Sequence, residues 1–354
     1  SAFPPLPPPV QSPTVKIPIY YLHQVAEKIT DMGVDLHAWL ARSQLLQSQL
    51  DDTSHTLSFA TFRQLIRDAL VMTQEPALGL LIGSRLLLNN HGVLGYAAMN
   101  SSSLQQAIEV LERYSLLRTP LITLGHQMDG QHLRVTLSEN YPLGDIRTPM
   151  HEVTMLGVKN VVDYLAAGTP PITQVTFAFA KPAYAALAEE MFQCEVVYGQ
   201  PRTGFGLPAD IAARPLNRAD PNTYREALVI CQRELDKIIQ DETLALRVRR
   251  VLIERSNAFP SLQLTARLFH MTPRTLHRKL QDEGTSYRAL LDDVRCALAM
   301  EHLKSDRLSV QEIGFTLGYT DMANFRRAFK RWQGLAPTDF RQSQLTLRSP
   351  HPPR

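Results

Sequence analysis

The chain has 354 residues, of which 44% are apolar and 20% are charged, and its formal net charge is +3. This length predicts about two to three domains, and the composition is that of a folded globular protein rather than a fibrous or disordered one. No apolar run reaches the roughly 18 to 20 residues needed to span a bilayer, and the start lacks a signal-peptide core, so the sequence predicts a cytoplasmic protein without a membrane partner.

The three cysteines and the charge distribution narrow the class further. Cys194, Cys231 and Cys296 are far apart and odd in number, which argues against a disulfide framework or a Cys-x-x-Cys metal site. Residues 243–343 hold 17 Lys and Arg against 10 Asp and Glu, a net charge of +7, which leaves −4 for the rest. A polyanionic partner is therefore expected for this region alone.

Residues 1–18 contain seven prolines and are predicted to be a disordered tail, with binding of a partner as a second possibility. Residues 19–209 are predicted to form an α+β domain. Helical spacing or capping indicates helices at 20–31, 36–41, from Ser58, from Ser102 or Ser103 to Leu117, and at 150–167 and 182–192. Strands are predicted at 121–126, 132–138, 173–180 and near Val196 and Phe205, in a small antiparallel sheet with a hairpin turn at Asp129-Gly130.

Neither the glycines nor the histidines of this region indicate catalysis. The glycine-rich stretch from Gly79 has no Gly-Lys-Ser/Thr and follows no strand, so it is interpreted as helix ends and close packing rather than a nucleotide site. His151-Glu152 has no second histidine at the spacing of a zinc protease. We therefore predict no enzyme activity, no metal and no cofactor.

Residues 210–242, which include Pro215 and Pro221, are interpreted as a linker and a linker helix at 223–240 that can serve dimerisation. An all-α domain is predicted at 243–343, and a disordered tail at 344–354. Within this domain, Ser261 caps a helix carrying Leu262, Leu264, Ala266 and Leu268. His270 and Met271 make a turn, after which Thr272 and Pro273 begin a second helix that Gly284 closes.

A second helix-turn-helix pattern follows at 309–341. Ser309 and Glu312 form a capping box, Gly318 ends the first helix, and Thr320 is expected to cap a second helix that runs to about Gly334. The aromatic face of this second helix is predicted to be buried: Phe325, Ala328, Phe329 and Trp332. Its opposite face is cationic: Asn324, Arg326, Arg327, Lys330 and Arg331. In the first copy Leu276 and Leu280 point inward, whereas Arg274, His277, Arg278 and Gln281 point outward.

Residues 287–303 are predicted to form one amphipathic helix of about 25 Å between the two copies. A single basic helix can be merely a solvated face. Two such helices on one face, about 34 Å apart, would enter successive major grooves of one duplex. The duplication therefore favours the interpretation that both helices read DNA.

The region 244–341 resembles the DNA-binding domain of the AraC/XylS family of bacterial transcription regulators. In the second copy the resemblance is carried by Ile313, Leu317, Gly318, Tyr319, the run from Phe325 to Trp332, Gly334 and Pro337. In the first copy it is carried by Leu276, Arg278, Leu280 and Gly284, followed by Arg295. One departure is Gly314, where the family usually has Ala, and we expect it to loosen the first helix by about 1 kcal/mol.

The resemblance implies roles for the exposed side chains. Base reading is expected of Arg274, His277, Arg278, Met322, Ala323, Asn324 and Arg327. Phosphate contacts are expected of Gln281, Arg326, Lys330 and Arg331.

The front region is similar, less specifically, to the amino-terminal effector domain of one branch of that family, which includes regulators of ornithine use and of virulence. The carriers are Gly79-Leu80, the run from Gly92 to Tyr96, Ala107, Arg113-Tyr114, the run from Phe205 to Leu207, and Pro215-Leu216. This resemblance implies a small-molecule effector of unknown identity and a homodimer on promoter DNA, with RNA polymerase as a further partner if the protein activates transcription. Two alternatives stay open: a dimeric DNA binder without an effector, and an enzyme or repair domain joined to a DNA-binding module.

Overall fold

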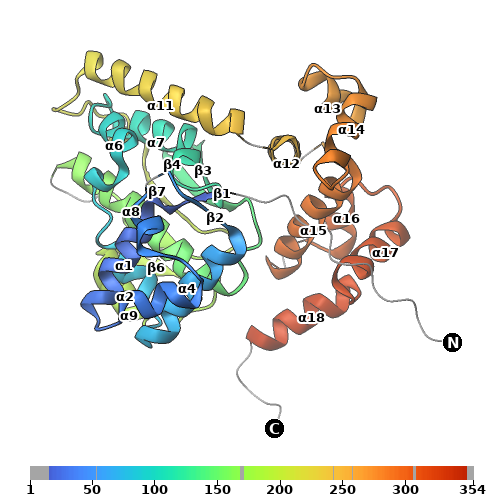
Figure 1. The fold of residues 1–354 in the computed structure, drawn as a ribbon, viewed down its shortest axis with the longest axis horizontal. Coiled ribbons are helices and arrows are strands. Elements are labelled where there is room, and N and C mark those ends of the chain that lie inside the picture. The colour runs from blue at the N-terminus through green and yellow to red at the C-terminus, as the bar shows by residue number, and fades with distance from the viewer. Residues whose placement is uncertain are drawn as a thin grey trace, which may run out of the picture. The chain divides into compact units, whose positions relative to one another are not determined.

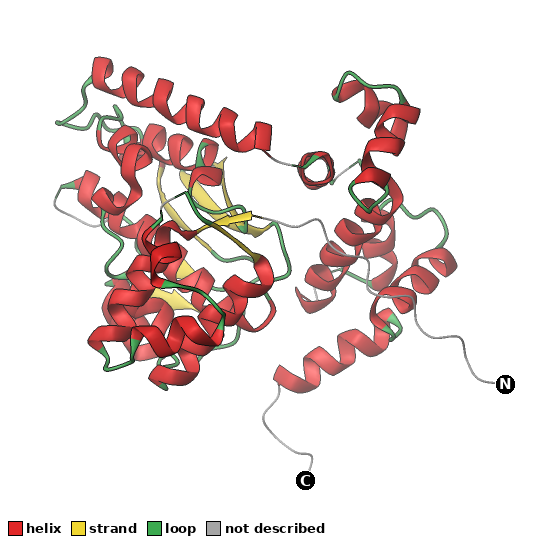
Figure 2. Cartoon of the chain, viewed as in Figure 1, coloured by secondary structure: helices red, strands yellow, loops and turns green. Residues whose placement is uncertain are grey.

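The computed structural model describes residues 16–348 except 53, 168–170, 242, 257 and 306–307. Its contacts separate the chain into one compact unit at 15–240 and a second that begins at 241. The N-terminal unit mixes helices and strands, whereas the described part of the C-terminal unit contains helices and loops (Figures 1 and 2). The predicted fold class is confirmed: an α+β unit followed by an all-α unit with two helix-turn-helix pairs.

The described strands of the N-terminal unit are β1 (Lys16–Pro18), β2 (Thr56–Ser58), β3 (Ile122–Asp129), β4 (His132–Glu139), β5 (Gln174–Thr176), β6 (Glu195–Val197) and β7 (Gly204–Pro208). Its α-helices are α1 (Leu22–Asp31), α2 (Leu36–Arg42), α3 (Gln47–Asp51), α4 (Phe59–Thr73), α5 (Leu78–Gly83), α6 (Gly92–Met99), α7 (Leu104–Arg113), α8 (Arg147–Ala166), α9 (Ala185–Phe192), α10 (Ala209–Ala212) and α11 (Pro221–Asp241). Four short 3-10 helices accompany them: η1 (Ile19–Tyr21), η2 (Leu88–His91), η3 (Ser115–Leu117) and η4 (Gly144–Ile146).

Five strands form the main sheet in the order β3-β4-β7-β5-β6, and β1 pairs with β2 in a separate antiparallel ribbon. The predicted hairpin is confirmed, since Asp129 pairs with His132 and Gly130 has φ +58° in the turn. The prediction of an antiparallel sheet is wrong at one edge, where β5 and β6 run parallel. The reason is α9, which follows β5 and precedes β6 in the chain. This helix returns the chain to the end of the sheet where β5 began, so that β6 runs in the same direction as β5.

The glycines near residue 79 serve close helix packing, as predicted. A Cβ at Gly79 would lie 2.6 Å from the Cα of Pro149, and a Cβ at Gly83 would lie 3.1 Å from the Cα of Val153. Glycine thus lets α5 approach the backbone of α8, the long buried helix of this unit. This pair of helices lies on the same core as the sheet.

Several predicted boundaries in the N-terminal unit are wrong. Residues 16–18 of the predicted tail form β1, and residues 1–15 lie outside the described part. The strand predicted at 173–180 ends at Thr176, the helix predicted at 182–192 begins only at Ala185, and α7 ends at Arg113 before η3. The predicted linker helix corresponds to α11, whose Ala227 and Cys231 are buried in the N-terminal core, so it belongs to that unit.

The C-terminal unit contains α12 (Leu244–Glu254), α13 (Leu262–Leu268), α14 (Pro273–Asp282), α15 (Tyr287–Ser305), α16 (Val310–Thr316), α17 (Met322–Gln333) and α18 (Pro337–Arg348). Two small cores share α15: one lies with α12 to α14, and the other with α16 to α18. The side chains of Phe259 and Leu298 pack against both cores. The two helix-turn-helix pairs are therefore joined through a common helix, as the sequence predicts.

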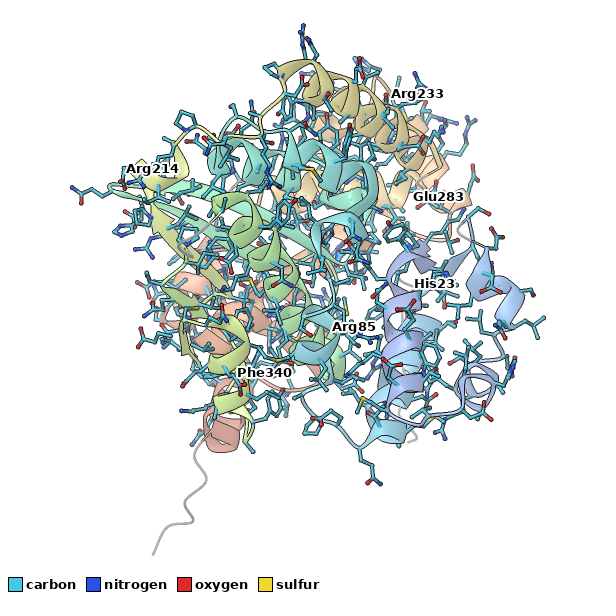
Figure 3. All side chains as sticks on the ribbon, turned by 90° about the vertical axis from the view of Figure 1, so that its left-hand side faces the viewer. His23, Arg85, Arg214, Arg233, Glu283 and Phe340 are labelled. Atoms are coloured by element: carbon cyan, nitrogen blue, oxygen red, sulfur yellow. The ribbon has the colours of Figure 1, made fainter. Side chains whose placement is uncertain are left out.

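The first and last helices of this unit, α12 and α18, begin at well-defined residues. Glu283, labelled in Figure 3, accepts hydrogen bonds from the backbone N–H groups of Leu244 (2.8 Å) and Ala245 (2.7 Å), the first turn of α12. At the other end, Pro337 begins α18. The prediction of an unstructured tail at 344–354 is wrong for residues 344–348, which are helical, and residues 349–354 lie outside the described part.

Candidate nucleic-acid interface

The first helix-turn-helix pair, α13 and α14, is built by local capping. The Oγ of Ser261 accepts from the N–H of Leu264 (3.2 Å), and the Oγ1 of Thr272 accepts from the N–H of Thr275 (3.2 Å). Between the helices His270 adopts φ +52°, the left-handed conformation that turns the chain. These contacts confirm the predicted boundaries of the first pair.

The second pair, α16 and α17, has the predicted capping box. Ser309 donates its N–H to the Oε2 of Glu312 (2.7 Å), and Glu312 donates its N–H to the Oγ of Ser309 (3.1 Å). The hydrogen bonds from Ser309 hold the pKa of the Glu312 carboxyl below its ordinary value, so the box is ionised at neutral pH.

The cap of α17 differs from the prediction. Asp321, not Thr320, accepts the N–H of Ala323 on its Oδ1 at 2.8 Å. In the first pair the cap comes two residues after the left-handed residue His270, whereas in the second it comes three residues after Gly318, which has φ +79°. The turn of the second pair is therefore one residue longer than that of the first. Equivalent positions on α14 and α17 are those at the same distance from the caps Thr272 and Asp321.

The aromatic back of α17 is buried as predicted, except that Trp332 is half-buried. Phe325 and Phe329 have no exposed surface, and their rings lie 6.1 Å apart. Phe329 also contacts Trp332 (6.4 Å) and Phe340 of α18 (5.5 Å), the latter labelled in Figure 3. Edge-to-face contacts of this kind add to the apolar burial that fixes α17 on its core.

Arg295 of α15 anchors the turn of the second pair. Its guanidinium lies 4.8 Å from the ring centre of Tyr319 and 5.2 Å from that of Phe259. Gly318 leaves space for the guanidinium of Arg295, because a Cβ at residue 318 would lie 3.2 Å from the Nη2 of Arg295. The sequence places Arg295 in a family motif, and the structure shows what it holds.

Four equivalent positions face outward on the two candidate reading helices. Counted from the caps Thr272 and Asp321, they are the second, fifth, sixth and ninth residues. On α14 they are Arg274, His277, Arg278 and Gln281, and on α17 they are Ala323, Arg326, Arg327 and Lys330; all eight are exposed. At 100° per residue these positions form an arc centred about 130° from the buried fourth and eighth residues, which are Leu276 and Leu280 on α14 and Phe325 and Phe329 on α17.

The remaining predicted contact residues lie at the edges of this face. Asn324 is exposed and accepts a hydrogen bond from the Nη2 of Arg327 (2.7 Å). Arg331 is exposed and forms an ion pair with Asp292 of α15 (3.1 Å). The structure thus places Asn324 and Arg331 beside the outward face rather than at its centre.

Met322 differs from the other predicted base readers. Its side chain is half-buried against α16, since a Cβ at Gly314 would lie 2.7 Å from its Sδ and its Cε. This position does not support a role in base contact. It also explains Gly314, which is buried and leaves room for the thioether rather than merely loosening its helix.

The cap alignment exposes an inconsistency in the expected roles. His277 was assigned to bases and Arg326 to phosphates, yet both are the fifth residue after their caps. The equivalence depends on the cap of α17 being Asp321 rather than the predicted Thr320. A further exposed cation of α14, Lys279, is the seventh residue after its cap and is equivalent to the buried Ala328 of α17, so it lies away from the outward face.

The described residues contain no group of three or more His, Cys, Asp or Glu side chains that could hold a metal ion. His151 and Glu152 have partners inside the N-terminal unit. The ring of His151 contacts the hydroxyl of Thr203 (2.9 Å) and the carboxylate of Glu139 (3.0 Å). The carboxylate of Glu152 accepts a hydrogen bond from the hydroxyl of Tyr184 (2.8 Å). Among the helices of the described ranges, none combines the length and the apolar character needed to cross a bilayer.

Comparison with known proteins matches both units. Residues 33–216 match the arabinose-binding N-terminal domain of the AraC transcription regulator, and residues 265–343 match a helix-turn-helix domain. The ornithine utilization regulator of Pseudomonas aeruginosa is 33% identical over 92% of this chain and 96% of its own length. The regulator VirS of Mycobacterium tuberculosis is 25% identical over 88% of this chain and 92% of its own length. The crystal structure of the regulator CdpR from Pseudomonas aeruginosa is 23% identical, covers 91% of this chain and 98% of its own, and has a TM-score of 0.46.

Proposed function

Because the chain belongs to the AraC family of transcription regulators, we propose that α14 and α17 read two half-elements of one promoter site and that the N-terminal unit binds a small effector that controls this reading. Double-stranded DNA is the partner of the C-terminal unit. The observation that carries the proposal is the repetition of four outward positions on the two capped helices, each backed by a buried apolar stripe.

Base contacts are assigned to residues of the outward faces and to Asn324, which lies beside the outward face of α17. Arg274, Arg278 and Arg327 can each pair bidentately with guanine, and Asn324 can pair with adenine once Arg327 releases its side chain. His277 and Ala323 complete the base-reading set. The placement of Met322 supports its removal from this set.

Phosphate contacts are assigned to Gln281, Arg326, Lys330 and Arg331. The equivalence of Arg326 with His277 supports a base contact for Arg326 as well, which makes it the most informative position to test. Arg331 contributes a charge already shared with Asp292, so we expect the smaller effect from it.

The experiment is selection of genomic fragments by the purified protein, followed by titration of the best site across salt. Arg327→Ala should cost about 1 to 3 kcal/mol and relax the preference at one base pair. Lys330→Ala should weaken all sequences alike and reduce the salt slope by about one unit. Loss of affinity that is the same for all sequences in both variants would contradict the assignment of Arg327 to a base contact. Arg326→Ala decides between the two candidate roles of Arg326 by the same criterion: a relaxed preference at one base pair indicates a base contact, and uniform weakening indicates a phosphate contact.

A homodimer and an effector complete the proposal. On α11 the side chains of Val229 and Ile230 are 60% and 45% exposed, an apolar surface that supports pairing with a second copy. Sedimentation of the wild-type protein and of Val229→Glu tests this, with a shift to monomer as the expected result. RNA polymerase is a further partner if the regulator activates, which a promoter-reporter assay decides.

A further inference from the structure

The N-terminal unit contains a cavity of about 140 Å³ that is lined mainly by α1, α4, α5 and α8. Its wall is mostly apolar, with Leu22, Phe62, Ile66, Ile82 and Met150 among the lining residues. A cavity of about 150 Å³ with such a lining is known to accept benzene. The space therefore fits an apolar body of about one aromatic ring.

Polar groups converge on this cavity from three short helical segments. Tyr21 ends η1, His91 ends η2 and Arg118 directly follows η3, and all three line the cavity. The Tyr21 hydroxyl lies 2.8 Å from the Nδ1 of His91. Arg118 donates from Nη2 to the backbone carbonyl of His91, and its guanidinium lies 4.3 Å from the ring centre of Tyr20. These contacts hold Arg118 and His91 together.

Two nitrogen atoms of this group have no hydrogen-bond partner among the described residues. They are the Nε2 of His91, a residue only 8% exposed, and the Nε of Arg118. Burial, as the larger cause, and the positive charge of Arg118, as the smaller, lower the pKa of His91 to about 4. The ring of His91 is therefore neutral at pH 7. Burial also raises the pKa of Tyr21, which keeps its proton and donates it to Nδ1. The His91 proton then lies on Nε2, and both unpartnered atoms are donors.

The charge of Arg118 is also uncompensated in this cavity. The lining includes neither Asp nor Glu, and no ion pair to Arg118 occurs among the described residues. A partly buried cation with a free N–H favours an anionic ligand that brings acceptor atoms. Ornithine also carries a carboxylate, but its two ammonium groups would find no Asp or Glu in this lining.

We propose that this cavity is the effector site and that it binds a small carboxylic acid with an apolar body of about one ring, whose carboxylate accepts from Arg118 and His91. The inference rests on the proposed function, in which the N-terminal unit is the sensor. It adds the chemical class of the effector and the two residues that recognise it.

The test uses the full chain and a set of probes in acid and amide pairs: benzoate with benzamide, phenylacetate with phenylacetamide, and hexanoate with hexanamide, with ornithine as a cationic probe. Calorimetry and thermal unfolding should show binding of at least one acid, with its amide at least about tenfold weaker. Arg118→Met should abolish that binding. Arg118→Lys should restore the acid preference in part, which keeps the test valid should Arg118→Met fail to fold.

Arg113→Met is the matched control, because Arg113 ends α7, just before η3 and Arg118 in the chain, but does not line the cavity. It should bind the acid as the wild type does. Amides or ornithine binding as well as the acids, or no binding of any acid at millimolar concentration, would overturn the assignment.

DNA titration separates this inference from the proposed function. Specific operator binding together with no acid binding would overturn the cavity assignment alone. Acid binding that left operator affinity unchanged would support the cavity assignment and overturn the control of DNA binding by an effector.

Discussion

Gly314 offers a quantitative test of how the second helix-turn-helix pair is packed. Replacing it with Ala adds one methyl group inside α16 and removes the conformational cost of glycine, a gain of about 1 kcal/mol in a helix. The new Cβ would, however, lie 2.7 Å from the thioether of Met322 and 3.2 Å from the Cδ1 of Phe325. The thioether is the far end of a flexible, half-buried side chain and can move aside, so the packing cost lies at the lower end of the about 1 to 3 kcal/mol of overpacking. We expect this cost to offset the helix gain, so that Gly314→Ala changes the stability of the C-terminal unit by less than about 0.5 kcal/mol.

The displaced end of Met322 is the contact that offsets the helix gain. In a Met322→Ala background this obstruction is gone, and the same substitution should then stabilise the unit by about 1 kcal/mol. The two effects differ by about 1 kcal/mol, which is within the coupling energy expected of side chains in direct contact. Gln311→Ala, an exposed substitution on the same helix, should show no dependence on residue 322.

The assay is urea unfolding followed by the fluorescence of Trp332. The chain has two tryptophans, and the other, Trp39, is buried in the N-terminal unit, so a Trp39→Phe background isolates the signal. The free energies of the four variants close the cycle. Additive effects, with Gly314→Ala stabilising by the full 1 kcal/mol in the presence of Met322, would refute the packing explanation.

Two further predictions follow from the contacts. Asp321→Ala should cost the C-terminal unit about 1 kcal/mol of unfolding free energy, whereas Thr320→Ala should cost almost nothing, because only Asp321 caps α17; equal losses would contradict the observed cap. Burial raises the pKa of Glu152 to about 8, although the hydrogen bond from Tyr184 lowers it, so the folded chain retains a proton that the unfolded chain loses near pH 4.5. Stability of the N-terminal unit should therefore fall as pH rises from 6.5 to 8, by about 2 kcal/mol, and Glu152→Gln should remove this slope in unfolding measured at the two pH values; an unchanged slope would show that Glu152 is not its source.

Local signals explain why the C-terminal unit could be predicted closely. Ser261, Thr272 and Ser309 cap helices through contacts three residues away, and the stripe of Phe325 and Phe329 repeats at helical spacing. Such signals depend on neighbouring residues alone. The same reasoning misplaced the cap of α17 by one residue, because Thr320 and Asp321 are both good caps and only the length of the turn chooses between them.

Contacts between distant segments explain what could not be predicted. The parallel pairing of β5 and β6, the burial of Cys231 of α11 in the N-terminal core, and the helical end of the predicted C-terminal tail all depend on which surfaces meet. Gly314 shows the same limit: its helix propensity can be estimated from the sequence, but the contact with Met322 cannot.

The sequence by itself determined the class of the protein, because caps, turns and apolar stripes of two helix-turn-helix pairs are written within short stretches of chain. Only the tertiary structure decided which cationic side chains share equivalent positions on the two helices and where the cavity of the N-terminal unit lies. Tyr21, His91 and Arg118 are separated by 70 and 27 residues, and no local pattern connects them. They meet because burial of the apolar faces of α1, α5, α7 and α8 brings three short segments to one wall of the cavity.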